Sequence, residues 1–562
     1  MGALRRLTLA HPHRETRVSR MWRAGVRAAF VATIAAGCAE PADQTAVIAA
    51  GGDADALIPL LWNQTQGRID TELMFDKLAD LGPGQSSLGD ASYTPRLAKT
   101  WTWAKDSLSI TFQLDPRARW HDGVPVTARD VQFAYTVYTD TSVHANAGED
   151  FRRALDSVTA PDSVTAVVWY HARSPEQFHS VAYNLVPLPE HLLTNIRRDS
   201  LRTSAFARHP VGNGPFRFIA WTPGDRLELA ANTEYAWGRP PLDRVIVMTL
   251  RPDAASRAVL AGDADFYERF TLDDVAEAAK SKDVEVVHVG QYAYSLVNFN
   301  QVGPDGRSPH PVLGTAAMRR ALTMAVNRPA IVRNVLDSLA RPALGPFTRA
   351  QWTADTTLRQ LAYDTAAAAK TLDSLGWRRG PDGTRARNGK PLGFTLTVMS
   401  SSRPLMRTAE LLQQAWTAAG VKVTLDPLDP RALAERLGGW QFDAATLTWN
   451  ASPSPSGLRQ TWGSASHRKG SPYNAGGWAN AAFDAQVDSG LADRSLAGAK
   501  AHFAKAYQFA VDEAPALWLY EPALVLGKSR RLVTGPIQPD AWWQSVRNWK
   551  VTGPRRGGAP AR

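Results

Sequence analysis

The chain has 562 residues, of which 44% are hydrophobic and 21% are charged. This composition suits a globular protein with large buried cores and excludes a disordered one. The formal net charge of +11 would suit a nucleic-acid-binding protein, but seven arginines and one glutamate lie in the first 27 residues, and the rest of the chain carries only +5. No basic stripe remains there, so we expect no nucleic-acid partner.

The first segment is typical of an export signal. Arg23 and Arg27 precede an apolar run at 28–36, which ends at Gly37 and Cys38. Basic residues, a short apolar run and small residues together form a signal peptide, and the run is too short to span a membrane. We therefore predict a signal peptide at 1–37, with Met21 as an alternative start, and no membrane span elsewhere.

Cys38 is the only cysteine, which excludes disulfides within the chain and cysteine metal sites. A single Cys after Gly37 resembles the bacterial lipobox, in which the thiol is lipidated and the Cys becomes the first residue. Ala35 stands where the lipobox usually has Leu, and the alternative is a buried or incidental cysteine. On the lipobox interpretation, residues 38–46 form a lipidated tether, and the protein stays at the cell envelope, on the periplasmic or extracellular face of a membrane.

Alternating side chains predict a hairpin followed by a helix between 101 and 138. Trp101 and Trp103 alternate with polar residues before a Lys-Asp-Ser turn, and apolar residues then recur at 108, 110, 112 and 114. Both patterns are typical of half-buried strands. Thr127 can cap the helix that follows, and Asp130 suits its positively polarised N-terminus.

A loop between that hairpin and helix contains His121 and Asp122, which could belong to a catalytic or metal site. No second histidine stands nearby at ligand spacing, and the chain has no H-E-x-x-H, P-loop or G-x-S-x-G motif. Asp122 can instead accept hydrogen bonds in the turn at Gly123. We interpret the pair as scaffolding of the loop.

The block at 95–135 is similar to the signature of family 5 of the bacterial extracellular solute-binding proteins, the oligopeptide, dipeptide and nickel receptors of ATP-binding cassette importers. The matching parts are a proline and "LAKTW" before the hairpin, the strand "FQL", and the turn and helix "WHDGVPVTARDV". One departure is Asp115, where the family usually has Arg.

Later blocks continue the resemblance. The segment 209–221, "HPVGNGPFRFIAW", is similar to a turn of the family, with Asn213 in place of Thr. We attribute its glycines to a tight chain reversal rather than to a phosphate cradle. Asp263 and Asp265 lack a third ligand nearby, so we expect a solvated turn rather than a metal site.

The second half of the chain predicts helices packed on parallel strands. Apolar residues at 318, 321, 322 and 325 follow helical spacing, within a segment that resembles a helix of the family's second lobe. A strand at 392–398, a helix that ends at Gly420 and a strand at 421–425 form a βαβ unit, whose strands should be parallel. A helix around 503–510 precedes a strand in "APALWLYEP".

The resemblance implies an α/β fold of the two-lobed periplasmic-binding-protein (Venus-flytrap) type, with an extra subdomain inserted in lobe I and the ligand held between the lobes. The expected divisions are 47–80, 208–290 and 515–550 for the lobe I core, 81–207 for the inserted subdomain, 291–514 for lobe II and 551–562 for a disordered tail.

The resemblance also implies the function: capture of a peptide or another small polar solute and its delivery to the permease subunits of an ABC importer. We expect a monomer with no cofactor, no metal and no catalytic residues. Two alternatives on the same fold are a secreted hydrolase and an envelope signalling receptor. A hydrolase would need a clustered acid, base, nucleophile or metal set, which the residue spacing does not indicate.

Two places bear on the ligand. In dipeptide-binding relatives an Arg-Pro pair after a lobe II strand meets the peptide carboxylate, so Arg403 is the matching anion clamp; a solvent-facing Arg at a helix start is an equally good interpretation. Those relatives hold the peptide ammonium with an aspartate in a loop where this chain has Ser452 and Ser454. The predicted ligand-binding residues are Arg403, Trp449, Asn450, Ser452, Ser454 and Trp462.

The missing aspartate affects the choice of ligand, because a buried ammonium group without a carboxylate is costly. We therefore predict that a peptide with a free amine binds poorly in the usual pose. The preferred ligand has an anionic or neutral polar end near Arg403, as in an N-blocked peptide or a saccharide-like molecule that stacks on Trp449 or Trp462.

Overall fold

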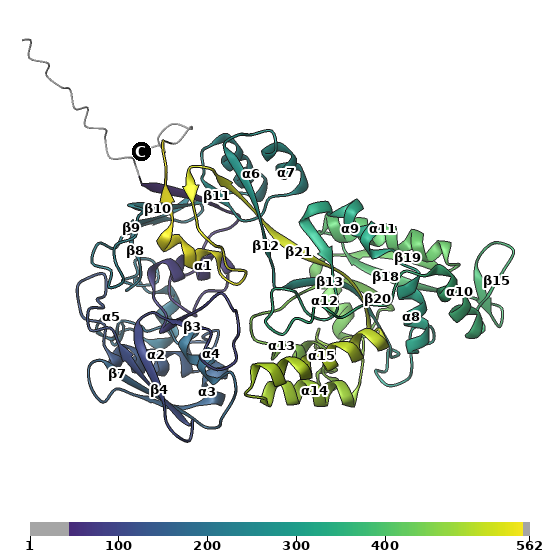
Figure 1. The fold of residues 1–562 in the computed structure, drawn as a ribbon, viewed down its shortest axis with the longest axis horizontal. Coiled ribbons are helices and arrows are strands. Elements are labelled where there is room, and N and C mark those ends of the chain that lie inside the picture. Colours follow the sequence, from purple (N-terminus) through teal and green to yellow (C-terminus); the bar gives the residue numbers. More distant parts are fainter. Residues whose placement is uncertain (1–43, 555–562) are drawn as a thin grey trace, which may run out of the picture. The chain divides into compact units, whose positions relative to one another are not determined.

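A computed structural model describes residues 44–554, and most of their strands join one twelve-stranded mixed sheet (Figure 1). Along the sheet the order is β19 (Lys422–Leu428), β18 (Gly393–Met399), β20 (Ala444–Asn450), β13 (Ala293–Phe299), β21 (Ala516–Ser529), β11 (Phe266–Tyr267), β1 (Thr45–Ala50), β10 (Arg244–Thr249), β9 (Arg226–Ala231) and β8 (Phe216–Thr222). Two further strands, β12 (Val284–Gly290) and β14 (Ala340–Pro342), pair with β21.

Strand β21 is long because it belongs to both halves of this sheet. Its first residues pair with β13 and β14, and its register with β12 begins at Ala523 opposite Gly290. Figure 1 shows β12 and β21 running together through the middle of the view. The chain thus crosses between the halves at 290–292 and at 521–523. We call residues 44–290 with 523–554 the first lobe, and 291–522 the second lobe.

The first lobe combines its part of the large sheet with a smaller antiparallel sheet in the order β4 (Ala98–Trp103), β5 (Ser109–Leu114), β7 (Thr165–Tyr170), β6 (Leu155–Thr159). Its other elements are α1 (Thr65–Met74), β2 (Ala79–Leu81), β3 (Tyr93–Pro95), α2 (Ala128–Thr139), α3 (Gly148–Ala154), α4 (Gln177–Ala182), α5 (Glu190–Leu193), η1 (Arg198–Thr203), α6 (Pro252–Ala261), α7 (Leu272–Ala278), β22 (Leu532–Val533), η4 (Trp542–Asn548) and β23 (Lys550–Val551). One hydrophobic cluster runs through both sheets, so the core does not separate at the predicted limits of the inserted subdomain, 81–207.

The second lobe has helices on both faces of its sheet. Strand β13 directs apolar side chains to both faces, so each face needs a covering layer. Tyr294 and Leu296 pack into one hydrophobic cluster, and Val297 and Phe299 pack into another. The covering elements are α8 (Ala316–Met324), α9 (Arg328–Val335), η2 (Asp337–Leu339), α10 (Thr365–Ser374), β15 (Arg378–Arg379), β16 (Arg385–Arg387), β17 (Lys390–Pro391), α11 (Arg403–Ala418), α12 (Pro430–Gly438), α13 (Gly457–Trp462), η3 (Ser464–Ser466), α14 (Ala481–Ala492) and α15 (Leu496–Glu513).

Local sequence patterns predict several of these elements correctly. The hairpin is β4–β5, and the Asp130 carboxylate accepts the Thr127 N–H at the start of α2 at 2.7 Å. Strands β18 and β19 are parallel, as the βαβ pattern indicates. Gly420 follows α11 with φ +87°, a left-handed conformation that favours glycine at the end of a helix.

The loop with His121 and Asp122 has structural contacts. The His121 ring lies 3.0 Å from the Gly214 carbonyl oxygen through Nε2, and burial lowers its pKa to about 4. Asp122 accepts the Val124 N–H at 3.1 Å. The sequence spacing did not indicate its second partner, His191, whose Nε2 lies 2.8 Å from the Asp122 carboxylate.

Two expectations about loops are wrong in part or in whole. Asp263 is exposed, as expected, but Asp265 is not in a solvated turn: it is 1% exposed, accepts the Val47 N–H at 2.9 Å and pairs with Arg531 at 2.6 Å. The glycines at 212 and 214 lie against the backbone of Met74, where a Cβ on Gly212 would be 2.0 Å from the Met74 oxygen. Close backbone approach, rather than a chain reversal, therefore requires glycine there.

The ends of the chain bear on export and anchoring. The predicted signal peptide and Cys38 lie outside the described residues, as do residues 555–562 of the predicted tail. Val551, the first residue of that tail, is part of β23. Between 44 and 554, none of the helices has the length and apolar character needed to cross a membrane.

Candidate functional site

Two neighbouring cavities share Ser452. The loop cavity, about 430 Å³, is lined by Tyr294, Pro346, Gln351, Thr448, Trp449, Asn450, Ala451, Ser452, Ser454, Pro455, Gly457, Leu458, Gln460, Thr461, Tyr473 and Tyr507. The charged cavity, about 290 Å³, is lined by Pro59, Leu60, Trp62, Arg68, Thr71, Glu72, Phe75, Lys77, Asn146, Ala147, Asp150, His179, Tyr183, Asn184, Val186, Ser452, Pro453 and Asp540. The loop cavity is lined by the second lobe alone, and the charged cavity is lined by the first lobe together with Ser452 and Pro453 of the second. Together the two cavities form the candidate ligand site.

The loop cavity is built at the end of β20. Strand pairing places Trp449 opposite Tyr294, and the Ala451 N–H donates to the Tyr292 carbonyl oxygen at 2.6 Å, which fixes where the chain leaves the strand. The Trp449 ring stacks on Tyr473, with centroids 5.7 Å apart and planes 23° from parallel. A half-buried indole held in this way offers an apolar face to a ligand.

The loop after β20 contacts a carboxylate of the first lobe. The Ser454 hydroxyl donates to Glu176 Oε2 at 2.8 Å, and the Ser87 hydroxyl donates to Glu176 Oε1 at 2.5 Å. Burial raises the pKa of Glu176, although the two hydroxyls favour its charged form. Glu176 therefore holds the Ser454 loop to the first lobe.

Further hydrogen bonds run beside Glu176. The Ser87 hydroxyl accepts from the Trp352 indole N–H at 3.2 Å, and the Tyr292 hydroxyl donates to the Gln85 side chain at 2.9 Å. Because each pair joins the two lobes, these contacts depend on how the lobes meet. We call Ser87, Glu176, Trp352 and Ser454 the polar seam.

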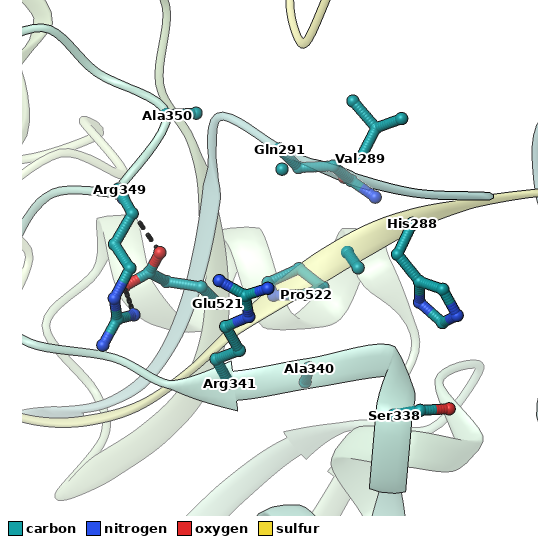
Figure 2. A pocket seen from close by; sticks show the side chains of 12 residues that line it. His288, Val289, Gln291, Ser338, Ala340, Arg341, Arg349, Ala350, Glu521 and Pro522 are labelled. Atoms are coloured by element: carbon teal, nitrogen blue, oxygen red, sulfur yellow. Dashed lines mark hydrogen bonds and ion pairs between the residues drawn. The ribbon is translucent and has the colours of Figure 1, made fainter. Parts of the chain in front are cut away.

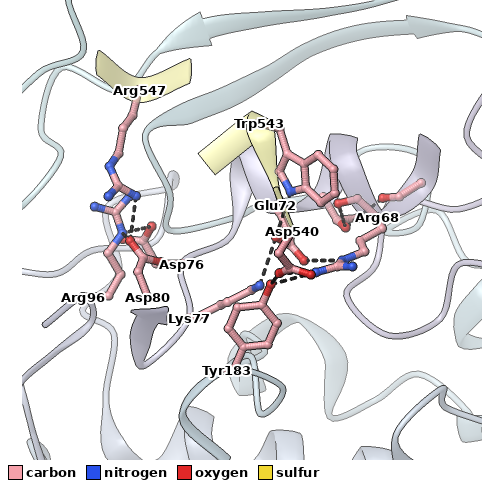
Figure 3. A network of polar contacts seen from close by, with 12 residues as sticks. Arg68, Glu72, Asp76, Lys77, Asp80, Arg96, Tyr183, Asp540, Trp543 and Arg547 are labelled. Atoms are coloured by element: carbon pink, nitrogen blue, oxygen red, sulfur yellow. Dashed lines mark hydrogen bonds and ion pairs between the residues drawn. The ribbon is translucent and has the colours of Figure 1, made fainter. Parts of the chain in front are cut away.

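The wall of the charged cavity carries a chain of ion pairs (Figure 3). Glu72 on α1 pairs with Arg68 at 2.8 Å and with Lys77 at 3.0 Å. Asp540 accepts a hydrogen bond from the Tyr183 hydroxyl and lies 3.7 Å from Arg68. Lys77 also lies over the Tyr183 ring, 3.5 Å from its centroid.

Protonation in this wall follows burial and pairing. Burial alone would raise the pKa of Glu72, but Lys77 and Arg68 lower it to about 2. Burial lowers the pKa of Lys77, and Glu72 opposes that shift. The pairs therefore keep Glu72 charged at neutral pH, and the charges are largely matched within the protein.

A second ion-pair group continues from this wall toward the C-terminal segment. Arg96 pairs with Asp76 at 3.2 Å and lies 3.5 Å from Asp80, and Arg547 pairs with Asp80 at 2.8 Å (Figure 3). Burial raises the pKa of Asp76 in spite of Arg96. These pairs fasten η4 onto the segment after α1.

His179 is a neutral polar group in the lining of the charged cavity. Burial lowers its pKa to about 4, so the ring is uncharged at pH 7. Its Nδ1 lies 2.5 Å from the Tyr93 hydroxyl, and the ring stacks on Tyr183 with centroids 5.1 Å apart. When Tyr93 donates to Nδ1, the Nε2–H becomes a donor without charge.

The structure brings four of the predicted binding residues together. The loop cavity is lined by Trp449, Asn450, Ser452 and Ser454. Trp462 instead lies beneath its wall: it is 2% exposed, and its indole N–H donates to the Tyr294 hydroxyl at 3.0 Å. Its role as a stacking surface would require it to become exposed.

Arg403 lies at the exposed start of α11, whose N-terminus is capped by Ser402, and it lines neither cavity. It does follow β18, which runs parallel to β20, so both strands end at the same edge of the sheet. The clamp role of Arg403 stays a prediction.

Sequence reasoning missed Glu176, because its contact with Ser454 joins positions 278 residues apart. It also missed Tyr473, and it did not use the i,i+4 spacing of Arg68 and Glu72, which was a signal for the ion pair on α1. Among residues 44–554, no group of three or more His, Cys, Asp or Glu side chains is placed to hold a metal ion.

Comparison with known proteins gives a family match. The model of the bacterial extracellular solute-binding proteins, family 5 (middle region), matches residues 92–470. The oligopeptide-binding protein AppA of Bacillus subtilis is 26% identical over 454 residues, which cover 79% of this chain and 80% of AppA.

Solved structures share the fold. The substrate-binding protein CtaP of Listeria monocytogenes is 21% identical, with a TM-score of 0.78 over 91% of this chain and 100% of CtaP. NikZ of Campylobacter jejuni, solved with Ni(L-His), is 21% identical, with a TM-score of 0.70 over 90% of this chain and 99% of NikZ. At this identity the likeness concerns the two-lobed α/β architecture alone.

Proposed function

Because the chain belongs to family 5 of the bacterial extracellular solute-binding proteins, we propose that it captures a peptide or another small polar solute between its lobes and delivers it to an ABC importer. The observation that carries this proposal is the charged cavity, whose first-lobe wall is completed by Ser452 and Pro453 of the second lobe, together with the loop cavity of the second lobe, which shares Ser452 with it. A ligand that contacts both walls favours the closed arrangement of the lobes, so that capture and closure are linked.

Peptide is the leading ligand class for two reasons. The matched relative AppA is an oligopeptide-binding protein, and the two cavities together offer an aromatic surface and neutral donors. Ser452, Ser454 and Asn450 can bond to peptide groups, and Trp449 can cover an apolar side chain.

The charge pattern refines this ligand. Glu176 is the carboxylate nearest Ser454, but both of its oxygens already accept hydroxyl groups. Glu176 also lines neither cavity, so a ligand ammonium would meet no free carboxylate beside Ser454, and we keep the proposal that a free-amine peptide binds less well than its N-blocked form. Arg403 is the proposed partner of an anionic end.

The proposed setting is the cell envelope. Cleavage of residues 1–37 and lipidation of Cys38 would anchor a monomer to the membrane beside the permease. This follows from the order of basic, apolar and small residues in the leader. A Cys38→Ser variant should appear in the soluble fraction or remain unprocessed.

Native mass spectrometry of the protein, purified without denaturation, tests the capture function. We expect an added mass that disappears on unfolding and whose fragments identify a peptide or polar solute. Calorimetry with matched free-amine and N-acetylated peptides then tests the ligand class. If no molecule co-purifies and no peptide binds, the capture proposal is contradicted. If only the free-amine peptides bind, the preference for an N-blocked peptide is contradicted.

A further inference from the structure

A third cavity lies where the chain crosses between the lobes, apart from the candidate ligand site (Figure 2). Its volume is about 220 Å³. The first lobe supplies His288, Val289, Gly290 and Ala523, and the second lobe supplies Gln291, Ser338, Ala340, Arg341, Arg349, Ala350, Glu521 and Pro522. Both crossings, at 290–292 and 521–523, therefore form part of its wall.

Positive charge is in excess in this crossing cavity. Glu521 accepts the Arg349 N–H at 2.9 Å and the Arg349 guanidinium at 2.5 Å, so both of its oxygens are engaged. Figure 2 shows the Glu521 carboxylate turned toward Arg349, while the Arg341 guanidinium extends beside it with no dashed contact. Strand pairing places Arg341 opposite Glu521, yet its side chain makes no ion pair among the described residues.

We propose that the crossing cavity is a second binding site, for a small carboxylate or phosphate anion. The Arg341 guanidinium is the primary contact, because its planar donors match the oxygens of such anions. Gln291 and Ser338 line the same space and add neutral donors. A cation is disfavoured, because the only carboxylate of the lining is already paired with Arg349.

This site is built to respond to lobe movement. His288 and Arg341 belong to different lobes, so a change at the crossings alters their separation. The segment 346–351 also lies between the sites: Arg349 lines the crossing cavity, and Gln351 lines the loop cavity and donates to the Ser452 carbonyl oxygen at 3.2 Å. An anion that prefers one lobe arrangement would change the affinity of the candidate ligand site. By linkage, the ligand would change the affinity for the anion by the same factor. That linkage rests on the proposed function, whereas anion binding itself does not.

The test uses the full chain and no cleft ligand. Inorganic phosphate and succinate are titrated separately by calorimetry at constant ionic strength, with sodium chloride as the blank. We expect saturable one-to-one binding of at least one of them, and the two arms distinguish a phosphate site from a dicarboxylate site. Arg341 is exposed, so Arg341→Gln should weaken that binding about three- to fivefold, which is the range of a charge contact open to water.

Arg494→Gln is the matched control, because Arg494 is exposed, lines none of the three cavities and lies in the loop between α14 and α15. Its affinity for the anion should stay within about twofold of the unchanged chain, since a remote surface charge has little effect. No saturable binding of either anion, or equal losses in the two variants, would overturn the site.

Hydrogen exchange at 286–292 and 520–524 measures the response of the crossings. Slower exchange with the anion supports the linkage, and unchanged exchange overturns it.

Discussion

The two cavities that share Ser452 differ in the chemistry of their walls. The wall of the charged cavity is rich in ionic groups, but Glu72, Arg68 and Lys77 are matched to one another. The loop cavity has an aromatic surface and hydroxyls, and its nearest carboxylate, Glu176, is fastened by Ser87 and Ser454. We infer that a high density of charge does not mark the ligand contacts, because buried charges chiefly pair with each other. We therefore expect stability to depend on the charged wall and affinity to depend on the loop.

The strongest test of the charged wall is Glu72→Gln. This change leaves Lys77 and Arg68 without their shared carboxylate in a buried setting, which should lower the free energy of unfolding by about 3–5 kcal/mol. Denaturant titration measures the loss. Glu410→Gln is the control, because its partner Arg407 is on the surface, and it should cost less than about 0.5 kcal/mol. Equal losses in the two variants would break the contrast between the cavities.

The next effect concerns Asp70, which lies on α1 two residues before Glu72. Burial raises its pKa to about 7, and the Gln66 side chain, 2.8 Å away, offsets this only partly. The raised pKa means that the protonated form is favoured in the folded state. The contribution of the Asp70 carboxyl to the free energy of unfolding is therefore fully present below pH 3.8 and is lost as the pH rises through about 7.

Asp70→Asn should prevent this loss of stability at high pH, because an amide cannot lose the proton. At pH 8 the variant should be more stable than the unchanged chain by on the order of 2–4 kcal/mol, and the gain should shrink as the pH falls toward 4. Denaturant titrations at a series of pH values measure it. A gain that is the same at pH 4 and pH 8 would contradict the role of the carboxyl proton.

Much of the fold could be predicted because its determinants are local. The alternation in β5, the cap of α2 and Gly420 after α11 each depend on residues a few positions apart. Trp449, Asn450, Ser452 and Ser454 were predicted from the resemblance to the family, and they lie together because one loop after one strand carries them all; their contact with a ligand stays a prediction. Glu176 could not, because Ser87 and Ser454 reach it only in the tertiary structure. The spacing of Arg68 and Glu72 is local, but their contacts with Asp540 and Trp543 depend on the tertiary structure as well. Asp265 shows the same limit: its spacing indicated solvent, whereas its distant partner Arg531 allows it to be buried.

For the loop cavity, Trp449→Ala should reduce ligand affinity about 10- to 100-fold, through the loss of the stacked surface. Calorimetry with the co-purified ligand measures this. Trp169→Ala removes an indole that is 43% exposed on β7 and lines neither cavity, and it should leave affinity unchanged. Loss of affinity in both variants would indicate general destabilisation rather than a contact with the ligand.

The polar seam should give a smaller effect. Ser454→Ala removes one of the two hydroxyls on Glu176, which should weaken closure of the lobes by about 1 kcal/mol and ligand affinity about fivefold. Ser374→Ala, which removes only a hydrogen bond to Thr371 within α10, is the control.

Glu176 should make ligand affinity depend on pH. Its pKa is raised in the folded protein, so the protonated form is favoured, and the ligand affinity of the unchanged chain should fall as the pH rises through that pKa. Glu176→Gln cannot lose this proton, so its affinity should match that of the unchanged chain at low pH and change little as the pH rises. An unchanged pH profile would remove Glu176 from the coupling between the lobes.

The smallest expected effect decides whether Arg403 belongs to the site. Its position is exposed, and an ion pair in water contributes only about 0–1 kcal/mol, so Arg403→Gln should weaken a ligand with a free carboxylate by no more than about fivefold. The same ligand with an amidated end should be unaffected, which separates a charge contact from a change in packing. Arg407→Gln, one turn further along α11, should affect neither form. If Arg403→Gln changes both ligands equally or neither of them, the anionic end is held elsewhere, and the neutral donors of the loop cavity alone would then orient the ligand.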